Sequence, residues 1–217
     1  MEFKDKIVVI TGGSHGIGKA IAETFLKEGA LVEIIDIAPG NHFVWDISKK
    51  EVLEEFAATV IRKRGHIDYL INNAFPLMKG IDNCSYEEFQ YALAVGVTAP
   101  FYLSKLFSNH FANGAAIINI SSSRDASIIN ISSSRDRMSQ PQTESYTAAK
   151  GGIASLTHAL AISFSGRIRV NSISPGWIDI DYRIYNGADA IQQPVGRVGN
   201  PMDIENMVLF LCSDKAG

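Results

Sequence analysis

Cysteine, long apolar runs and an excess of basic residues are all scarce or missing in this sequence. Its two cysteines, Cys84 and Cys212, lie far apart, which predicts free thiols in a reducing compartment and neither a disulfide nor a metal site. A net charge of -3 argues against a broad nucleic-acid-binding face, which is usually basic. No apolar run is long enough to cross a bilayer, and the acids in Met1–Lys6 are unlike a signal peptide. A cytoplasmic protein without a nucleic-acid or membrane partner is therefore expected.

Apolar runs alternate with helical patterns along the 217 residues. The continuous run Ile7–Ile10 is typical of a parallel strand that is covered on both faces, and residues 16–28 then show helical spacing that Gly29 ends. The same alternation predicts strands at 31–35, 43–45, 67–71 and 168–173, and helices at 49–63, 86–111 and about 145–164. Pro100 can break the second of these helices. This rhythm predicts one domain over 1–217, an α/β fold with a Rossmann-type doubly wound parallel sheet in three α/β/α layers.

A short segment of the sequence occurs twice. IINISSSRD stands at 117–125 and again at 128–136, nine identical residues offset by eleven. Two copies of so short a unit do not make a solenoid, so a tandem duplication is the plain interpretation. A further strand is expected at 117–120 or at 128–131. Because the copies are identical, either can fill the strand without turning side chains to the wrong face.

A glycine-rich turn follows the first expected strand and opens the first helix. Residues 11–18 read TGGSHGIG, in which Gly12, Gly16 and Gly18 allow a tight turn and the close approach of a pyrophosphate. Ser14, His15 and Ile17 complete the turn. The start of the helix supplies partial positive charge, so the turn predicts a dinucleotide site.

An acidic residue ends the second expected strand. Asp36 lies 24 residues after Gly12, where a carboxylate can accept both ribose hydroxyls of NAD and would repel the 2′-phosphate of NADP. His15 could favour NADP, but a mostly neutral imidazole is a poor phosphate anchor. The sequence therefore favours NAD over NADP as the cofactor.

A tyrosine and a lysine are spaced for acid–base chemistry. Tyr146 and Lys150 are four residues apart on an expected helix, so both project from one face. A phenol is a weak base at neutral pH, but a nearby ammonium lowers its pKa. Tyr146 could then take the proton of an alcohol while hydride leaves for a nicotinamide, and a serine hydroxyl could hold the substrate oxygen.

Together these motifs resemble the short-chain dehydrogenase/reductase family, similar to its 3-oxoacyl-carrier-protein reductases and its sugar or polyol dehydrogenases. The motifs NNA at 72–74, YTAAK at 146–150 and RVNSISPG at 169–176 occur in the family's order. The resemblance implies an NAD(H)-dependent oxidoreductase, a homodimer or homotetramer, that interconverts a secondary alcohol and a ketone. It also implies additional cofactor contacts: Asp46 and Ile47 at the adenine, Asn72 and Ala74 on the adenosine side, and Pro175 and Gly176 beside the nicotinamide, with Tyr146 and Lys150 holding the nicotinamide ribose.

The duplication leaves two candidates for the catalytic serine. Members of the family carry it about thirteen residues before the tyrosine, which selects Ser133 in the second copy. Its duplicate Ser122 lies 24 residues before Tyr146, although residues 113–116 lead naturally into the first copy. If the first copy formed the strand, the excess chain would emerge at the carboxyl end of the sheet and crowd the site. A working enzyme therefore favours Ser133.

Four features depart from the family's pattern. Gly96 stands where an asparagine usually supports a proton relay to the lysine, Phe75 replaces a glycine, and Ile180 replaces a threonine that contacts the nicotinamide carboxamide. The sequence also ends where relatives continue into a last strand. These departures leave two alternatives open: a dinucleotide-binding protein without turnover, and a variant whose duplicated strand impairs activity.

Overall fold

The computed structural model describes residues 2–112 and 126–216. Within these residues six parallel strands form one sheet in the order β3-β2-β1-β4-β5-β6. The strands are β1 (Ile7–Thr11), β2 (Leu31–Asp36), β3 (Phe43–Val44), β4 (Tyr69–Asn72), β5 (Ser127–Ile131) and β6 (Arg169–Ile173). The chain starts in the middle of the sheet, runs to the β3 edge, returns and continues to the β6 edge. This order is that of a doubly wound sheet, as expected from the sequence.

Helices connect the strands. They are α1 (Gly16–Lys27), α2 (Lys50–Arg64), α3 (Tyr86–Leu93), α4 (Ala99–Phe107), α5 (Glu144–Ser163), α6 (Ala188–Ile191) and α7 (Pro201–Cys212). Shorter turns are η1 (Ala94–Thr98), η2 (Ser134–Asp136) and η3 (Asp214–Ala216). None of the helices in the described part of the chain is long and apolar enough to cross a membrane.

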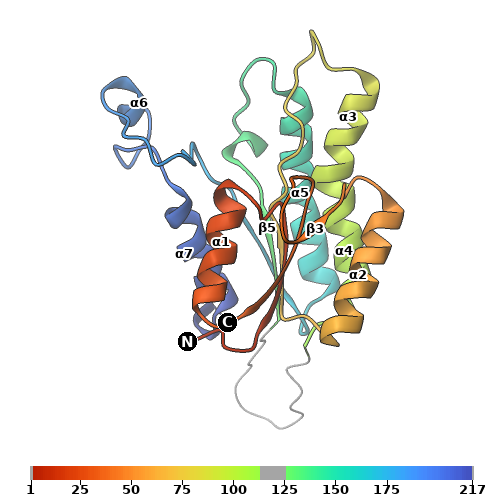
Figure 1. Cartoon of the computed structure of the whole chain (residues 1–217). Helices are drawn as coiled ribbons and strands as arrows, with labels where there is room; N and C mark the ends of the chain where they lie inside the picture. Colours follow the sequence, from red (N-terminus) through yellow and green to blue (C-terminus); the bar gives the residue numbers. More distant parts are fainter. Residues whose placement is uncertain (1, 113–125, 217) are drawn as a thin grey trace.

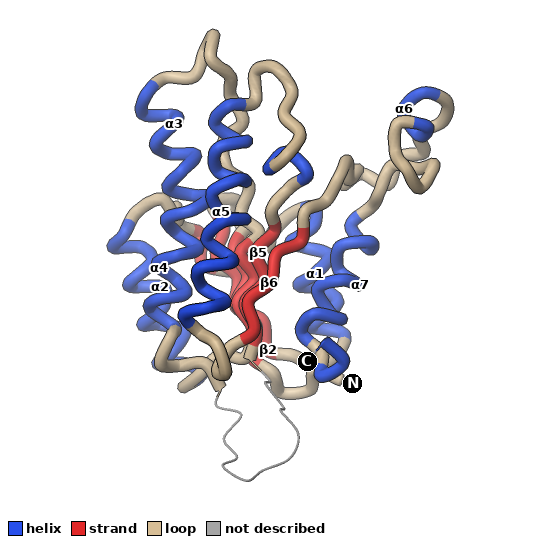
Figure 2. Tube along the Cα trace, turned by 180° about the vertical axis from the view of Figure 1, so that it is seen from behind, coloured by secondary structure: helices blue, strands red, loops and turns tan. Residues whose placement is uncertain are grey.

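The helices form a layer on each face of the sheet (Figure 1). α1 and α7 lie on one face, while α2, α4 and α5 lie on the other, and the same layers are visible from behind (Figure 2). Successive strand residues point to opposite faces, so Ile128 packs in one apolar cluster with Phe56 and Leu103. Its neighbour Ile129 packs in the other cluster, with Phe25. The structure therefore has the three α/β/α layers that the sequence predicts.

The second copy of the repeated segment forms the strand between β4 and β6. β5 comprises Ser127–Ile131, and the whole strand is buried. The first copy, with its expected strand at 117–120 and with Ser122, lies outside the described residues. Phe111, shortly before the undescribed segment, forms an isolated bridge with Ile67. Ser127, shortly after it, pairs with Tyr69, the first residue of β4. The chain therefore enters and leaves the undescribed segment at the amino end of β5, opposite the carboxyl ends of the strands.

The helix expected at 86–111 is interrupted, but ahead of the proline. α3 passes into the π-helical turn η1, and α4 then starts at Ala99 with Pro100 in its first turn. The N–H of Ala99 donates to the carbonyl of Ala94, so the hydrogen-bond pattern changes from π-helical to α-helical beside Pro100, which has no N–H to donate. α7 was not predicted from the sequence. At its start the N–H of Asn200 donates to the carboxylate of Asp203 at 2.9 Å, and Pro201 is the first residue of the helix.

Candidate active site

A cleft of about 1380 Å³ lies at the carboxyl ends of the strands. In Figure 1 the start of α3 and α6 stand beyond this end of the sheet. The expected site residues that line the cleft are Gly12, His15, Gly16, Ile17, Asp36, Asp46, Ile47, Ala74, Ser133, Tyr146, Lys150, Pro175 and Gly176. They come from loops after β1, β2, β3, β4, β5 and β6 and from α5. The fold thus brings together most of the residues selected from the sequence.

The glycine turn leaves backbone groups open to the cleft. Gly12 has a φ of +69°, and a Cβ there would lie 2.7 Å from the Cα of Ala74. Gly16 has a φ of +52°. In α1, all of which is described, the side chain of the N-cap residue His15 makes no capping bond and the first turn contains no acid. This helix start can therefore accept an anionic group, and the turn fits a dinucleotide pyrophosphate.

Ser14 and Asp36 join the glycine turn to the end of β2. Ser14 donates its backbone N–H, at 3.0 Å, and its hydroxyl, at 2.6 Å, to Oδ2 of Asp36. The N–H of Ala38 donates to the other carboxylate oxygen at 3.0 Å. Burial acts to raise the pKa of Asp36, but these hydrogen bonds outweigh it and leave the pKa below its ordinary value. Asp36 is therefore ionised at neutral pH and lines the cleft.

Asp46 occupies the cleft beyond β3. Its carboxylate accepts the N–H of Ser48 at 2.9 Å, and the hydroxyl of Tyr91 lies 3.5 Å away. Trp45 and Ile47, its neighbours in the chain, also line the cleft. This wall, made of the indole of Trp45, the aliphatic side chain of Ile47 and one carboxylate, lies over β2 and β3, beside Asp36.

Three of the expected cofactor residues lie behind the cleft wall. Ser14 is turned to Asp36, as described above. Gly18 packs under the glycine turn, where a Cβ would lie 2.1 Å from the carbonyl oxygen of Gly12. Asn72 is buried and donates to Asn130 Oδ1 at 2.8 Å. The next residue, Asn73, lines the cleft instead and donates its side-chain amide to the Gly12 carbonyl at 2.7 Å.

Reciprocal contacts tie β5 to α5. The hydroxyl of Ser132 donates to the Lys150 carbonyl at 2.9 Å, and Lys150 Nζ donates to the Ile131 carbonyl at 2.6 Å. One residue earlier in β5 than Ile131, the side-chain amide of Asn130 donates to the hydroxyl of Thr157 at 3.0 Å. Burial lowers the pKa of Lys150 to about 8. The second copy of the repeat thus supplies the strand residues that hold α5 in place.

Tyr146 stands above Lys150 on the cleft side of α5. Lys150 Nζ lies 5.5 Å from the centroid of the phenol ring. Burial raises the pKa of Tyr146, while its hydrogen bond with Ser133 and the charge of Arg135 oppose the shift without cancelling it. The expected lowering of this pKa by the ammonium is therefore wrong for this structure. The ammonium is held under the ring by a strand carbonyl, and desolvation of the phenolate outweighs the other effects.

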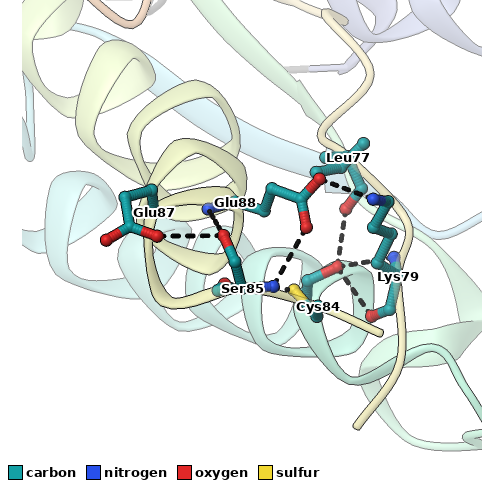
Figure 3. Close-up of polar contacts among 7 residues, drawn as sticks. Leu77, Lys79, Cys84, Ser85, Glu87 and Glu88 are labelled. Carbon is teal, nitrogen blue, oxygen red and sulfur yellow. Dashed lines mark hydrogen bonds and ion pairs between the residues drawn. The ribbon is translucent and has the colours of Figure 1, made fainter. Parts of the chain in front are cut away.

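The loop after β4 is fastened to Ser145, the residue before Tyr146 in α5. Figure 3 shows Leu77 and Lys79 of this loop beside Ser85 and Glu88 at the start of α3. The buried hydroxyl of Ser145 accepts the N–H of Lys79 at 2.8 Å and lies within 2.9 Å of the carbonyls of Leu77 and Lys79, either of which can accept its proton. Lys79 in turn forms an ion pair with Glu88 in the first turn of α3. The loop is thus held between α3 and α5.

Two of the departures from the family's pattern lie at the junction of this loop with α5. The ring of Phe75 packs on Tyr146 with 5.0 Å between their centroids. Gly96 is buried in η1, and a Cβ there would lie 2.7 Å from the Cβ of Ala149 and 3.3 Å from that of Pro76. Without movement of these neighbours, an asparagine cannot be placed at position 96. The third departure, Ile180, covers the glycine turn, with its Cγ2 3.1 Å from where a Gly16 Cβ would lie.

Sequence reasoning left three residues of this site out of its selection. Asn73 belongs to the NNA motif, but spacing alone cannot tell which asparagine faces the cleft. Thr11 accepts the N–H groups of Asn73 and Ala74 on its hydroxyl, both at 3.1 Å. Arg135 follows Ser133 by two residues and lines the cleft. Its position next to the candidate serine was the available signal.

The family model described as enoyl-(acyl carrier protein) reductase matches residues 12–217. An uncharacterized oxidoreductase of Thermotoga maritima is 36% identical over 98% of this chain and 90% of its own length. The L-fucose dehydrogenase of Mus musculus is 31% identical over 98% of this chain and 84% of its own. The fold and the cleft are those of a dinucleotide-binding oxidoreductase. The chain belongs to the short-chain dehydrogenase/reductase family.

Solved structures show the same fold. An apo SCOR enzyme from Clostridium thermocellum is 40% identical, with a TM-score of 0.85 over 95% of this chain and 86% of that one. The ligand-free aldohexose dehydrogenase of Thermoplasma acidophilum is 26% identical, with a TM-score of 0.84 over 98% of this chain and 89% of that one.

Proposed function

We propose that this oxidoreductase uses NAD(H) to interconvert a secondary alcohol and a ketone. The observation that carries the proposal is the meeting of Ser133, Tyr146 and Lys150 in one cleft with the open glycine turn. The turn and the start of α1 would hold the pyrophosphate, and Asp36 would hold the adenosine ribose. A nicotinamide bound there would supply the hydride acceptor for oxidation of the alcohol and the hydride donor for reduction of the ketone.

The residues of the chain handle the proton. Tyr146 takes the hydroxyl proton of the alcohol on its phenol oxygen, or returns it to the carbonyl oxygen in reduction. Ser133 holds the same substrate oxygen and stabilises its developing charge. The positive charge of Lys150 would oppose the rise in the pKa of Tyr146 that burial causes, because a nearby cation favours the phenolate. The ring of Phe75 against Tyr146 excludes water from one side of the phenol.

Tyr146→Phe tests the acid–base role. Its kcat for carbonyl reduction is expected to fall by about 10²–10⁴, the usual range for loss of a general acid, while NADH binding persists. Tyr86→Phe, at an exposed tyrosine on α3, is the matched control. Full activity of Tyr146→Phe would contradict the proposal. Binding of NADH without turnover in the unmodified protein, on any carbonyl of a wide panel, would support a non-catalytic dinucleotide-binding protein instead.

The preference for NADH rests on Asp36. Trp45 and Trp177 both line the cleft, so energy transfer to the reduced nicotinamide reports binding. Tighter binding of NADH than of NADPH is expected because Asp36 is ionised and repels a 2′-phosphate. Asp36→Ser should shift the ratio of the two dissociation constants toward NADPH by about tenfold or more. An unchanged ratio would refute the role of this carboxylate.

The relatives give a starting point for the substrate. One is named for L-fucose and one for aldohexoses. A substrate screen should therefore begin with sugars of about six carbons and with their neutral and acidic derivatives.

A further inference from the structure

Arg135 has a buried nitrogen without a hydrogen-bond partner at the substrate end of the cleft. It lies in η2, two residues after Ser133, and its backbone N–H donates to Ser133 Oγ at 3.2 Å. One guanidinium nitrogen, Nη2, donates to Gln140 Oε1. The other, Nη1, is buried and has no partner among the described residues. Buried charged donors without a partner are rare because desolvation is costly, so this nitrogen calls for an acceptor.

The charges around Arg135 favour an anionic acceptor. Asp36 and Asp46 are the acidic residues among the described lining of the cleft, and they lie over β2 and β3. Two strands, β1 and β4, separate β2 from β5, which leads to Arg135. The adjacent Asp136 is turned away and accepts the hydroxyl of Ser174 at 3.1 Å. No carboxylate of the described cleft lining therefore lies at this end to neutralise the guanidinium.

The second cation of the cleft is already engaged. Lys150 Nζ donates to the Ile131 carbonyl, below the ring of Tyr146. Among the described residues that line the cleft, Arg135 is thus the cation with a buried donor nitrogen that still lacks an acceptor. A single guanidinium suits a monoanion such as a carboxylate, with which it forms short, strong hydrogen bonds. A phosphate dianion would need further positive charge.

We propose that Arg135 binds a carboxylate of the substrate, so that the enzyme interconverts hydroxy acids and oxo acids. This inference rests on the proposed function, because it places the reacting oxygen at Ser133 and Tyr146. Arg135 then orients the substrate from a second point and acts as a specificity-determining residue. A neutral analogue would leave Nη1 unpaired and bind less well.

The first test compares substrates that differ only in charge. Short-chain oxo acids and their methyl esters are assayed by NADH oxidation with the unmodified enzyme, Arg135→Met and Arg137→Met. Arg137 is exposed and two residues away, so its variant changes the net charge equally. The unmodified enzyme and Arg137→Met should prefer the acids by about tenfold or more in kcat/KM, mainly through KM. Arg135→Met should abolish the preference, because its loss of kcat/KM on the acids should be at least about tenfold greater than any loss on the esters. An equal preference in all three proteins, or an equal loss on acids and esters, would overturn the assignment.

The second test needs no turnover. Butanoate and butanamide are titrated calorimetrically into each protein, alone and with NADH. Butanoate should bind the unmodified protein and Arg137→Met at least about tenfold more tightly than it binds Arg135→Met, while butanamide should not discriminate. Absence of this difference refutes the carboxylate site even if the proposed oxidoreductase activity is present. Conversely, selective butanoate binding without turnover would uphold the site and count against the proposed reaction.

Discussion

Replacing Lys150 with methionine should alter the pH dependence of stability in a defined direction. The lysine is 4% exposed, and burial lowers its pKa from 10.5 to about 8. A depression of this size corresponds to a penalty of about 3 kcal/mol for the charged form in the folded state. Methionine removes the penalty but also the bond to the Ile131 carbonyl, whose loss costs about 1–3 kcal/mol. The net change at neutral pH is therefore small.

The pH dependence isolates the electrostatic part. Below pH 8 Lys150 is protonated in both states, and the folded state bears the full penalty. Between pH 8 and 10.5 the unfolded state retains a proton that the folded state has lost, so the free energy of unfolding rises with pH. Above 10.5 neither state carries the charge and the penalty is absent. A methionine cannot titrate, so Lys150→Met lacks this rise.

Urea unfolding of both proteins at pH 7 and pH 10 measures the effect. The unmodified protein should gain about 2–3 kcal/mol relative to Lys150→Met between these values. Lys105→Met, at an exposed lysine on α4, is the control and should show no such change. The difference in the free energy of unfolding between the two proteins is measured at each pH. If this difference changes by less than about 0.5 kcal/mol from pH 7 to pH 10, the buried-ammonium account is refuted.

Three further predictions concern the repeat, the anchored loop and the contact between η1 and α5. Deleting residues 117–127 keeps Ile128–Ile131 of β5 and brings Ala116 to the position of Ser127, so NADH binding should persist and Tm should change by only about 2–4 °C; loss of binding would show that the deleted residues are needed. Ser145→Ala should lower the free energy of unfolding by about 1–3 kcal/mol in urea titrations, because it strands the buried polar groups of the loop. Gly96→Ala should destabilise by about 1–3 kcal/mol through overlap with Ala149, and Ala149→Gly should restore part of that loss. Gly151→Ala, where a Cβ meets nothing within 4 Å, should not destabilise.

Local patterns in the sequence were enough for the fold class and for much of the cleft. The apolar run at the start of the chain and the glycines after it predicted β1, the tight turn and α1, because each depends on neighbouring residues alone. The spacing of Tyr146 and Lys150 placed both on one side of α5, since residues four apart share a helix face. The alternation of strands and helices predicted a doubly wound parallel sheet, because parallel strands need crossover connections of this kind.

Contacts between distant segments settled the rest. Identical copies cannot be distinguished by periodicity, and pairing with β4 and β6 selected the second for β5. The side of β4 on which Asn72 lies became clear only from its buried bond with Asn130. The direction of the Tyr146 pKa shift depended on how deeply the phenol is buried. Whether the Arg135 nitrogen has a hydrogen-bond partner depended on which acceptors the fold places beside it. A repeat distance or a helical spacing is a property of consecutive residues, whereas burial and hydrogen-bond partners depend on residues brought together from remote parts of the chain.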